Sequence, residues 1–408
     1  MIRKIAKNTF LLSASQVIAR GIGFGYFVFL ARRLGVETFG VYNFTLAFVY
    51  NFVPVADFGI ERLVLRDIAR QPSKSQFYLA RLLPLRVVLG ILGFLGVLGM
   101  GIVLGQPRQQ IFYFGIFGVA LIPQSLTYLV VSLQNAREKM EYMAVANISI
   151  IGLTALIGVS FFQLGLSLPW ILFAYFLASF VVCFGFLGKL RKLGLSFKFK
   201  FDFKFWRQTL SQSWVFAVIL ILAVFYLRIS LVLIGVLENS YLTGIYGSAF
   251  KFVEAGILIP QSLALALFPL SSKLLVSDKE RLMRIYKKGL AVLFLGGLGV
   301  CLVMFSGARF IIPLVYGDEY LQAIPIFSIL GLAMALFFVN ALPGNVIHNS
   351  SRVKQFLPWA FLNFLVAVGL CLILIPRFSI IGAAWAVVGG EMAGLIINNW
   401  FVFKILKD

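Results

Sequence analysis

Apolar runs of about twenty residues recur along this chain and limit its possible folds more than any other feature. A helix needs about 20 mostly apolar residues to cross a bilayer. The chain of 408 residues is 61% hydrophobic and 12% charged, whereas soluble domains are about 45–50% apolar and about 25% charged. The sequence therefore predicts an all-α integral membrane protein. About twelve crossings are expected, at residues 9–30, 39–58, 84–105, 111–133, 143–163, 169–188, 213–236, 243–268, 287–305, 322–342, 356–375 and 382–403.

Basic residues divide unequally between the loops that join these runs. With the N-terminus in the cytoplasm, 28 Lys and Arg fall in one set of loops, Arg86 among them, and 5 in the other. Cytoplasmic loops carry the excess of Lys and Arg, so we expect a multi-pass protein of the cell membrane with both termini cytoplasmic. This topology also accounts for the net charge of +21 without any binding of nucleic acid.

The two halves of the chain resemble each other. The segment FGVYN at 39–43 returns 204 positions later as TGIYG at 243–247, and helix order and basic loops match as well. This predicts two six-helix lobes of the same orientation, residues 1–188 and 213–408, around a central cavity.

The linker, residues 189–212, has its own pattern. Phenylalanines at 197, 199, 201, 203 and 205 alternate with Lys198, Lys200, Asp202 and Lys204. Period two indicates an extended segment. One interpretation places its lysines at anionic headgroups on the cytoplasmic leaflet. The alternative is a linker that adheres non-specifically through its aromatic and basic residues and has no specific role.

Polar side chains recur at helical spacing in the first two crossings. Ser13, Gln16 and Arg20 share one face of the first helix, and Asn43, Ala47, Tyr50, Pro54 and Asp57 share one face of the second. A charge at membrane depth is costly unless it faces a bundle interior or a watery cavity. This hairpin is therefore predicted to form one wall of a polar cavity.

Further charges lie inside later crossings. Arg20 and Arg228 occupy nearby positions of the two repeats and could hold a phosphate or diphosphate by forked hydrogen bonds. The alternatives are structural pairing with Asp57, Glu254 or Glu391, or snorkelling. Lys251 and Glu254, three residues apart, could pair with each other or serve a ligand or coupling ion. Glu391 could carry a proton or only pair within the bundle. The polar face with Gln124 and Tyr128 indicates interhelical hydrogen bonding more often than a binding site.

The residues of reactive or metal-binding sites are sparse. The three cysteines have no CxxC spacing, His348 is the only histidine, and no catalytic motif appears. The expectation is a protein that is not an enzyme and holds no metal or other cofactor.

Three segments resemble a known family: NTFLLSASQVIARGIGFGYFVFLARRLGVETFGVYNF near the N-terminus, IIPLVYGDEYLQAIPIFSILG, and IIGAAWAVVGGE. They are similar to the polysaccharide transporter family, the Wzx-type flippases of lipid-linked oligosaccharides. Its superfamily also contains the MATE exporters and the lipid II flippases. The resemblance implies a MATE-like fold, alternating access and a polyprenyl-linked sugar as cargo. It also implies that Arg20, Arg228 and Lys251 match the family's cationic cavity residues, with Arg20 in the clearest motif.

Together these features predict a flippase for polyprenyl-diphosphate-linked oligosaccharide. Sugar contacts are assigned to Gln16, Asn43, Tyr50, Tyr128 and Tyr246. Asp57, Glu254 and Glu391 are candidates for proton or sodium coupling. Membrane lipids and polysaccharide-assembly machinery are expected partners of a monomer. The alternatives are an ion-coupled multidrug exporter of the same fold, which would favour acidic cavity residues, and a membrane-embedded glycosyltransferase or ligase, which would need a large catalytic loop.

Overall fold

Long helices make up the protein in this computed structural model, which describes residues 2–350 and 352–407, with side chains from residue 14 onward except 265, 266, 268, 269, 276, 348 and 349. The described residues contain no strand, and eleven helical segments are long and apolar enough to cross a membrane. The predicted class, an all-α integral membrane protein, is confirmed. Ser13 and His348 fall among the side chains outside this description.

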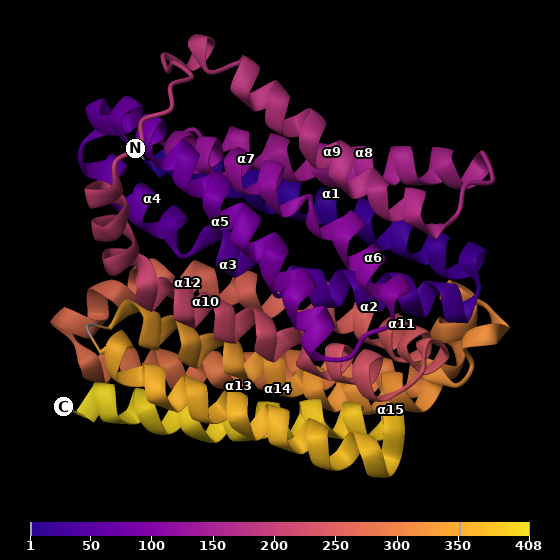
Figure 1. Cartoon of the computed structure of the whole chain (residues 1–408). Helices are drawn as coiled ribbons and strands as arrows, with labels where there is room; N and C mark the ends of the chain where they lie inside the picture. The colour runs from indigo at the N-terminus through magenta and orange to yellow at the C-terminus, as the bar shows by residue number, and fades with distance from the viewer. Residues whose placement is uncertain (1, 351, 408) are drawn as a thin grey trace. The chain divides into compact units, whose positions relative to one another are not determined.

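The helices follow one another with short connections, except for the longer segment 189–202 (Figure 1). Their bounds are α1 (Ile2–Leu34), α2 (Val36–Tyr50), α3 (Val53–Asp57), α4 (Ile60–Arg70), α5 (Ser75–Val103), α6 (Arg108–Gly118), α7 (Leu121–Asn135), α8 (Glu141–Gln163), α9 (Leu168–Gly188), α10 (Phe203–Leu237), α11 (Ser240–Gly256), α12 (Leu258–Ser277), α13 (Lys279–Tyr316), α14 (Ala323–Asn349) and α15 (Val353–Lys407). Three 3₁₀ turns, Pro72–Lys74, Arg191–Leu193 and Asp318–Tyr320, complete the described elements.

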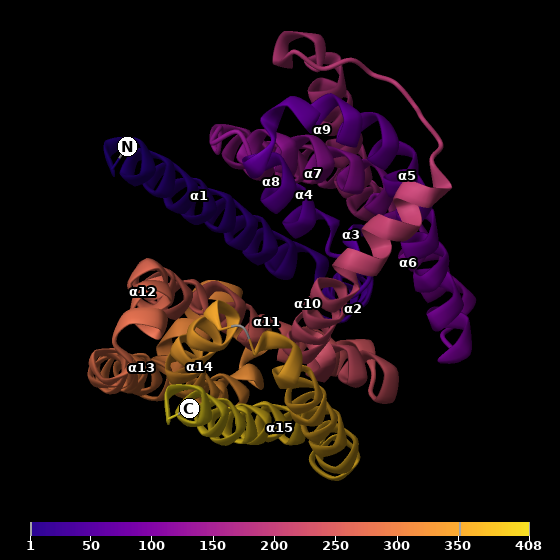
Figure 2. The ribbon, with the colours of Figure 1, turned by 90° about the vertical axis from the view of Figure 1, so that its left-hand side faces the viewer.

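The 55-residue α15 is a hairpin of two crossings (Figure 2). Its helical backbone is interrupted at Ser379, with φ 51° and ψ −136°. The two arms then pack antiparallel: the tilted rings of Trp359 and Trp400 contact each other with centroids 4.7 Å apart, and Gly390 lies against Ala367. The eleven long segments therefore supply twelve crossings, as the sequence predicts.

The second predicted crossing differs from the continuous helix expected at 39–58. The helix is interrupted by a turn at Asn51–Phe52, and again at Phe58 and Gly59, whose φ angles are 50° and 70°. Asn51 covers the first interruption by donating from its side-chain amide to the carbonyl of Ala47, at 2.9 Å. The expectation of a single polar stripe along this helix is wrong, because the turn at Asn51–Phe52 lies between Tyr50 and Pro54 and changes the direction in which the later side chains point.

Contacts divide the chain into two compact units: Met1–Phe27 with Thr45–Phe225, and Val28–Phe44 with Tyr226–Asp408. In the first unit α5 packs on α7, and α8 packs on α9. In the second, α13, α14 and α15 pack in succession (Figure 2). The second unit thus contains a segment of the first half, Val28–Phe44. The division into six-helix lobes 1–188 and 213–408 stays a prediction.

The internal repeat is visible as a symmetric contact within the second unit. A Cβ on Gly40 would overlap the carbonyl of Ser240, and a Cβ on Gly244 would overlap the carbonyl of Val36. Ser240 and Gly244 lie 204 positions after Val36 and Gly40. The two sequence repeats therefore contact each other through residues at equivalent repeat positions, which is the pattern of an isologous interface. The repeat register read from the sequence is reproduced in this contact.

The linker is extended only in its middle part. Residues 195–202 have no regular secondary structure, and α10 begins at Phe203. The side chain of Asp202 accepts a hydrogen bond from the backbone N–H of Phe205 at 3.0 Å, so it caps the start of α10. The prediction of an extended segment through Phe205 is wrong from Phe203 onward, because the cap starts a helix within the alternating pattern.

Substitution at the two symmetric glycines should weaken the packing of α2 on α11. Gly40→Ala and Gly244→Ala each place a methyl group against backbone that cannot move independently, which costs about 1–3 kcal/mol. We expect a lower apparent melting temperature in detergent for both variants. Gly25→Ala is the matched control, because a Cβ there meets nothing within 4 Å. Equal stability of all three variants would show that the close approach does not hold the helices together.

Candidate functional site

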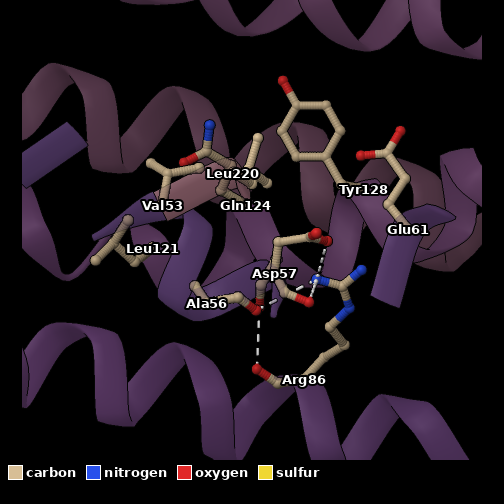
Figure 3. A pocket seen from close by; sticks show the side chains of 10 residues that line it. Val53, Ala56, Asp57, Glu61, Arg86, Leu121, Gln124, Tyr128 and Leu220 are labelled. Carbon is tan, nitrogen blue, oxygen red and sulfur yellow. Dashed lines mark hydrogen bonds and ion pairs between the residues drawn. The ribbon is translucent and has the colours of Figure 1, made fainter. Parts of the chain in front are cut away.

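A polar pocket of about 220 Å³ lies within the first unit (Figure 3). Five helices build it: α3 and α4, which flank the interruption at Phe58–Gly59, together with α5, α7 and α10. The turn is held tightly, because a Cβ on Gly59 would lie 2.8 Å from the backbone N of Ala217 on α10. The lining residues are Val53, Ala56, Asp57, Glu61, Arg86, Leu121, Gln124, Ser125, Tyr128 and Leu220.

An ion pair between Asp57 and Arg86 forms the floor of this pocket. Nη1 of Arg86 lies 2.7 Å from Oδ1 of Asp57 and also donates to the carbonyls of Ala56 and Asp57 at 3.2 and 3.3 Å. These carbonyls end α3, where helical bonding stops and a cation is favourable. The guanidinium, only 1% exposed, therefore neutralises a carboxylate and satisfies the end of a broken helix.

Other polar groups of the pocket have spare hydrogen-bonding capacity. Nε and Nη2 of Arg86 and Oε1 of Gln124 are buried without a hydrogen-bond partner among the described residues. The carboxylate of Glu61 also lines the pocket. The three buried atoms of Arg86 and Gln124 are shielded from solvent, while the residues that carry them line a space large enough for several water molecules. The arrangement suits a hydrated polar group.

Hydroxyl and aromatic groups extend this polar region. Tyr128 shares a hydrogen bond of 3.0 Å with the side-chain oxygen of Asn147. Tyr50 packs edge-on against Phe117 and Tyr175, with centroids 5.6 and 6.0 Å apart. Tyr50, assigned to sugar binding from the sequence, therefore lies in an aromatic cluster of the first unit.

A second charged cluster belongs to the second unit. Glu254 accepts an ion pair from Arg228 at 2.8 Å and another from Lys251 at 2.9 Å. Each of the three side chains is between 15% and 25% exposed. The structure thus brings together two predicted cationic residues and one predicted coupling residue. Two cations thus share one carboxylate.

Glu391, on the second arm of α15, is buried in the same unit. It is 3% exposed, and its Oε2 accepts a hydrogen bond from Asn340 at 2.7 Å. Tyr226 hydrogen-bonds the same carboxylate. The carboxylate is thus held by neutral groups, in contrast to Asp57 and Glu254, which are ion-paired.

The remaining predicted residues occupy separate environments. Gln16 and Arg20 are both exposed on one face of α1 in the first unit. Asn43, in the second unit, is 5% exposed and its side-chain amide lies where a Cβ on Gly247 would be. Tyr246 is fully buried and shares a hydrogen bond of 2.9 Å with Ser230.

Sequence reasoning missed the two charges that shape the pocket. Arg86 was assigned to a cytoplasmic loop, but it lies well inside α5 and is buried. Its position in the apolar stretch LLPLRVVLG was the available signal. Glu61 was missed because the predicted crossing ended at residue 58. No group of three or more His, Cys, Asp or Glu among the described residues could hold a metal ion.

Solved structures with a similar fold identify the class of protein. The chain superposes with TM-score 0.78 on an inward-facing multidrug resistance MATE family transporter of the MOP superfamily, at 15% identity, covering 96% of this chain and 95% of that one. It superposes with TM-score 0.76 on the lipid II flippase MurJ in an inward closed conformation, at 16% identity, covering 98% and 89%. At these identities the likeness shows the fold: this is a multi-pass membrane protein of the MATE type.

Comparison of the sequence with protein families assigns the protein to a narrower group than the fold does. Residues 5–275 match the family described as polysaccharide biosynthesis protein, and the chain belongs to that family. The resemblance seen in the sequence motifs is thereby confirmed. An uncharacterized membrane protein of Methanocaldococcus jannaschii is 26% identical over 150 residues, which are 36% of this chain and 29% of that relative's length.

Removing one member of the buried ion pair should destabilise the protein. Asp57→Ala leaves the guanidinium of Arg86 without its counter-charge, which costs about 3–5 kcal/mol. The double variant Asp57→Leu/Arg86→Met removes both charges and should recover part of this loss, but not all of it, because the carbonyls of Ala56 and Asp57 lose the donor that Arg86 supplies. Apparent melting temperatures of the purified proteins measure both effects. A double variant no more stable than Asp57→Ala would show that the residues do not act as a pair.

Proposed function

We propose that the protein is a flippase that moves a polyprenyl-diphosphate-linked oligosaccharide across the cytoplasmic membrane by alternating access. Membership of the polysaccharide biosynthesis protein family is the observation that carries this proposal. The fold similarity to a lipid II flippase supports it, since that protein's named cargo is also a lipid carrying a polar head group. The physical task is to take a charged sugar head through about 30 Å of hydrocarbon.

Cations inside the crossings would bind the diphosphate. Arg228 and Lys251 share Glu254, so a diphosphate could compete with the carboxylate for both of them by charge-assisted hydrogen bonds. Arg20, exposed on α1, would supply a further guanidinium. Gln16, on the same exposed face, could donate or accept hydrogen bonds with sugar hydroxyls.

Coupling to protons or sodium would use a carboxylate whose charge is not already balanced. Asp57 and Glu254 are ion-paired, whereas Glu391 is held by Asn340 and Tyr226. Taking up a cation at Glu391 would therefore change the net charge of its surroundings the most. We propose Glu391 as the coupling residue if transport is ion-driven.

The multidrug exporter is the second candidate. Its support is the fold shared with a multidrug resistance transporter, together with the acidic side chains Asp57 and Glu61 in the pocket of the first unit. The cationic cluster around Arg228 favours an anionic cargo instead, because it would repel the cationic compounds that such an exporter carries.

Deletion of the gene in its native host should leave the complete lipid-linked oligosaccharide on the inner leaflet. Loss of the flippase stops translocation without stopping synthesis, and lipid analysis with leaflet-specific labelling measures the result.

Complementation of the deletion by the Arg20→Ala variant should fail although the protein is present in the membrane. The Arg20→Lys variant should restore only part of the transport, because lysine cannot form the two parallel hydrogen bonds of a guanidinium.

Other outcomes would exclude this assignment. Accumulation of an incomplete glycan would indicate a glycosyltransferase or ligase. Unchanged glycans with altered dye efflux would indicate the multidrug exporter. Full activity of Arg20→Ala would show that Arg20 does not bind the cargo. The flippase assignment would then depend on the lipid analysis alone.

The orientation we propose, with both termini cytoplasmic, has its own test. Single cysteines at Lys198 and at Glu319 should react with an impermeant thiol reagent from opposite sides of the membrane, since an odd number of crossings separates them. The native cysteines Cys183, Cys301 and Cys371 are buried and would first be replaced by alanine. Reaction of both positions from one side would contradict the topology.

A further inference from the structure

The linker carries a surface that neither the pocket nor the charged clusters use. We propose that residues 197–204 form a binding surface for anionic phospholipid headgroups, with their phenylalanine rings in the adjoining acyl region. We call the extended part, residues 195–202, the strap. This surface belongs to the first unit and would bind membrane phospholipid, not the transported cargo.

The strap is fixed to α5 at several points. The side-chain amide of Gln76 both accepts from the backbone N–H of Ser196 and donates to its carbonyl, at 2.7 and 3.0 Å. Farther along, the backbone N–H of Lys200 donates to the carbonyl of Ala80 at 2.8 Å. This carbonyl is available because Pro84, four residues later, has no N–H to give it. The proline thus creates an acceptor on α5, and the strap occupies it.

Polar contacts close the end of the strap. Arg81 forms an ion pair with Asp202 at 2.8 Å, and the carbonyl of Arg81 accepts from the indole N–H of Trp206, also at 2.8 Å. The Arg81 guanidinium, and secondarily the Phe205 N–H, holds the pKa of Asp202 below its usual range. A lowered carboxyl pKa means that this contact is present above the ordinary carboxyl range and lost only in stronger acid. The Asp202 carboxylate therefore stays charged and can pair with Arg81 at every physiological pH.

With the strap attached in this way, the phenylalanine rings of residues 197–203 are exposed. Phe197, Phe199, Phe201 and Phe203 are 53%, 48%, 66% and 73% exposed. The first two contact each other, with centroids 5.0 Å apart, and Phe203 lies 5.1 Å from buried Trp206. Four neighbouring exposed phenylalanines on a segment with fixed backbone are an apolar patch that water does not favour.

Charge and membrane depth identify what covers this patch. Lys198, Lys200 and Lys204 are exposed between the rings, and the nearby acid, Asp202, is already paired with Arg81. The 35 residues of α10 would span about 52 Å at 1.5 Å per residue, more than the ~30 Å hydrocarbon core. About 22 Å of the helix therefore lies outside the core, and because its apolar stretch runs to Leu237, we place the polar first turns of α10 and the strap at headgroup level. Aromatic rings with lysines at that level match anionic lipid.

Depth measurements on the complete protein test the placement. Spin labels would be attached to single cysteines at Phe199 and Phe201, in nanodiscs containing 30% phosphatidylglycerol. Lys192, exposed in the same linker, is the control position. We expect oxygen to relax the labels at Phe199 and Phe201 more than a water-soluble nickel complex does, and the reverse at Lys192. Nickel-dominated relaxation at all three positions would overturn the proposal.

Lipid binding tests the charge. In Lys198→Gln/Lys200→Gln/Lys204→Gln, the preference for fluorescent phosphatidylglycerol over phosphatidylcholine should fall about tenfold or more, since each basic residue near the surface contributes substantially. The matched control is Arg281→Gln/Lys287→Gln/Lys288→Gln, which removes the same charge from exposed positions on α13. We expect less than about twofold loss there.

Two results would contradict a specific lipid surface. An equal loss in both triple variants would mean that any basic loop attracts these lipids. An unchanged preference in the strap variant would mean that the lysines serve another partner. Melting temperatures of both variants show whether folding is intact. Because the probe is a phospholipid and no cargo is present, failure here leaves the flippase proposal untouched.

Discussion

A peptide group inside hydrocarbon has no water to bond, so an interruption in a membrane helix must be covered by another part of the protein. The interruption after α3 shows the consequence. Where α3 ends, the guanidinium of Arg86 donates to the carbonyls of Ala56 and Asp57. At the end of α5 nearer the proposed headgroup surface, Pro84 leaves the carbonyl of Ala80 without its helical donor, and the backbone N–H of Lys200 in the strap donates to it. The polar pocket and the linker attachment thus both arise where helical hydrogen bonding fails.

Charged side chains inside the protein are likewise paired with neighbouring groups of opposite charge. Arg86 is paired with Asp57, whereas Arg228 and Lys251 share Glu254. A carboxylate shared by two cations, as Glu254 is, can be displaced by an incoming anion that forms charge-assisted hydrogen bonds with both of them. This difference is why the proposed function relies on the cluster of the second unit, while Asp57 and Arg86 are treated as a structural pair.

Duplication of the sequence has a physical counterpart in the contact of α2 with α11. Gly40 and Gly244 occupy equivalent repeat positions, and each lies against the backbone of the opposite helix. Small residues allow such close approach between membrane helices. The contact also explains why Val28–Phe44 is grouped with the second half of the chain: its partners lie there.

The sequence by itself determined the membrane class, about twelve crossings, the repeat offset of 204 and the family, because hydrophobic length, loop charge and motif are local properties of the chain. It also placed Lys251 and Glu254 together, since a spacing of three brings side chains onto one helical face. Only the tertiary structure decided the partners of Asp57, Arg86 and Arg228. Those pairings join residues from different helices, and the interruptions at Asn51–Phe52 and Phe58–Gly59 change the facing of side chains in a way that a regular helical period cannot reproduce.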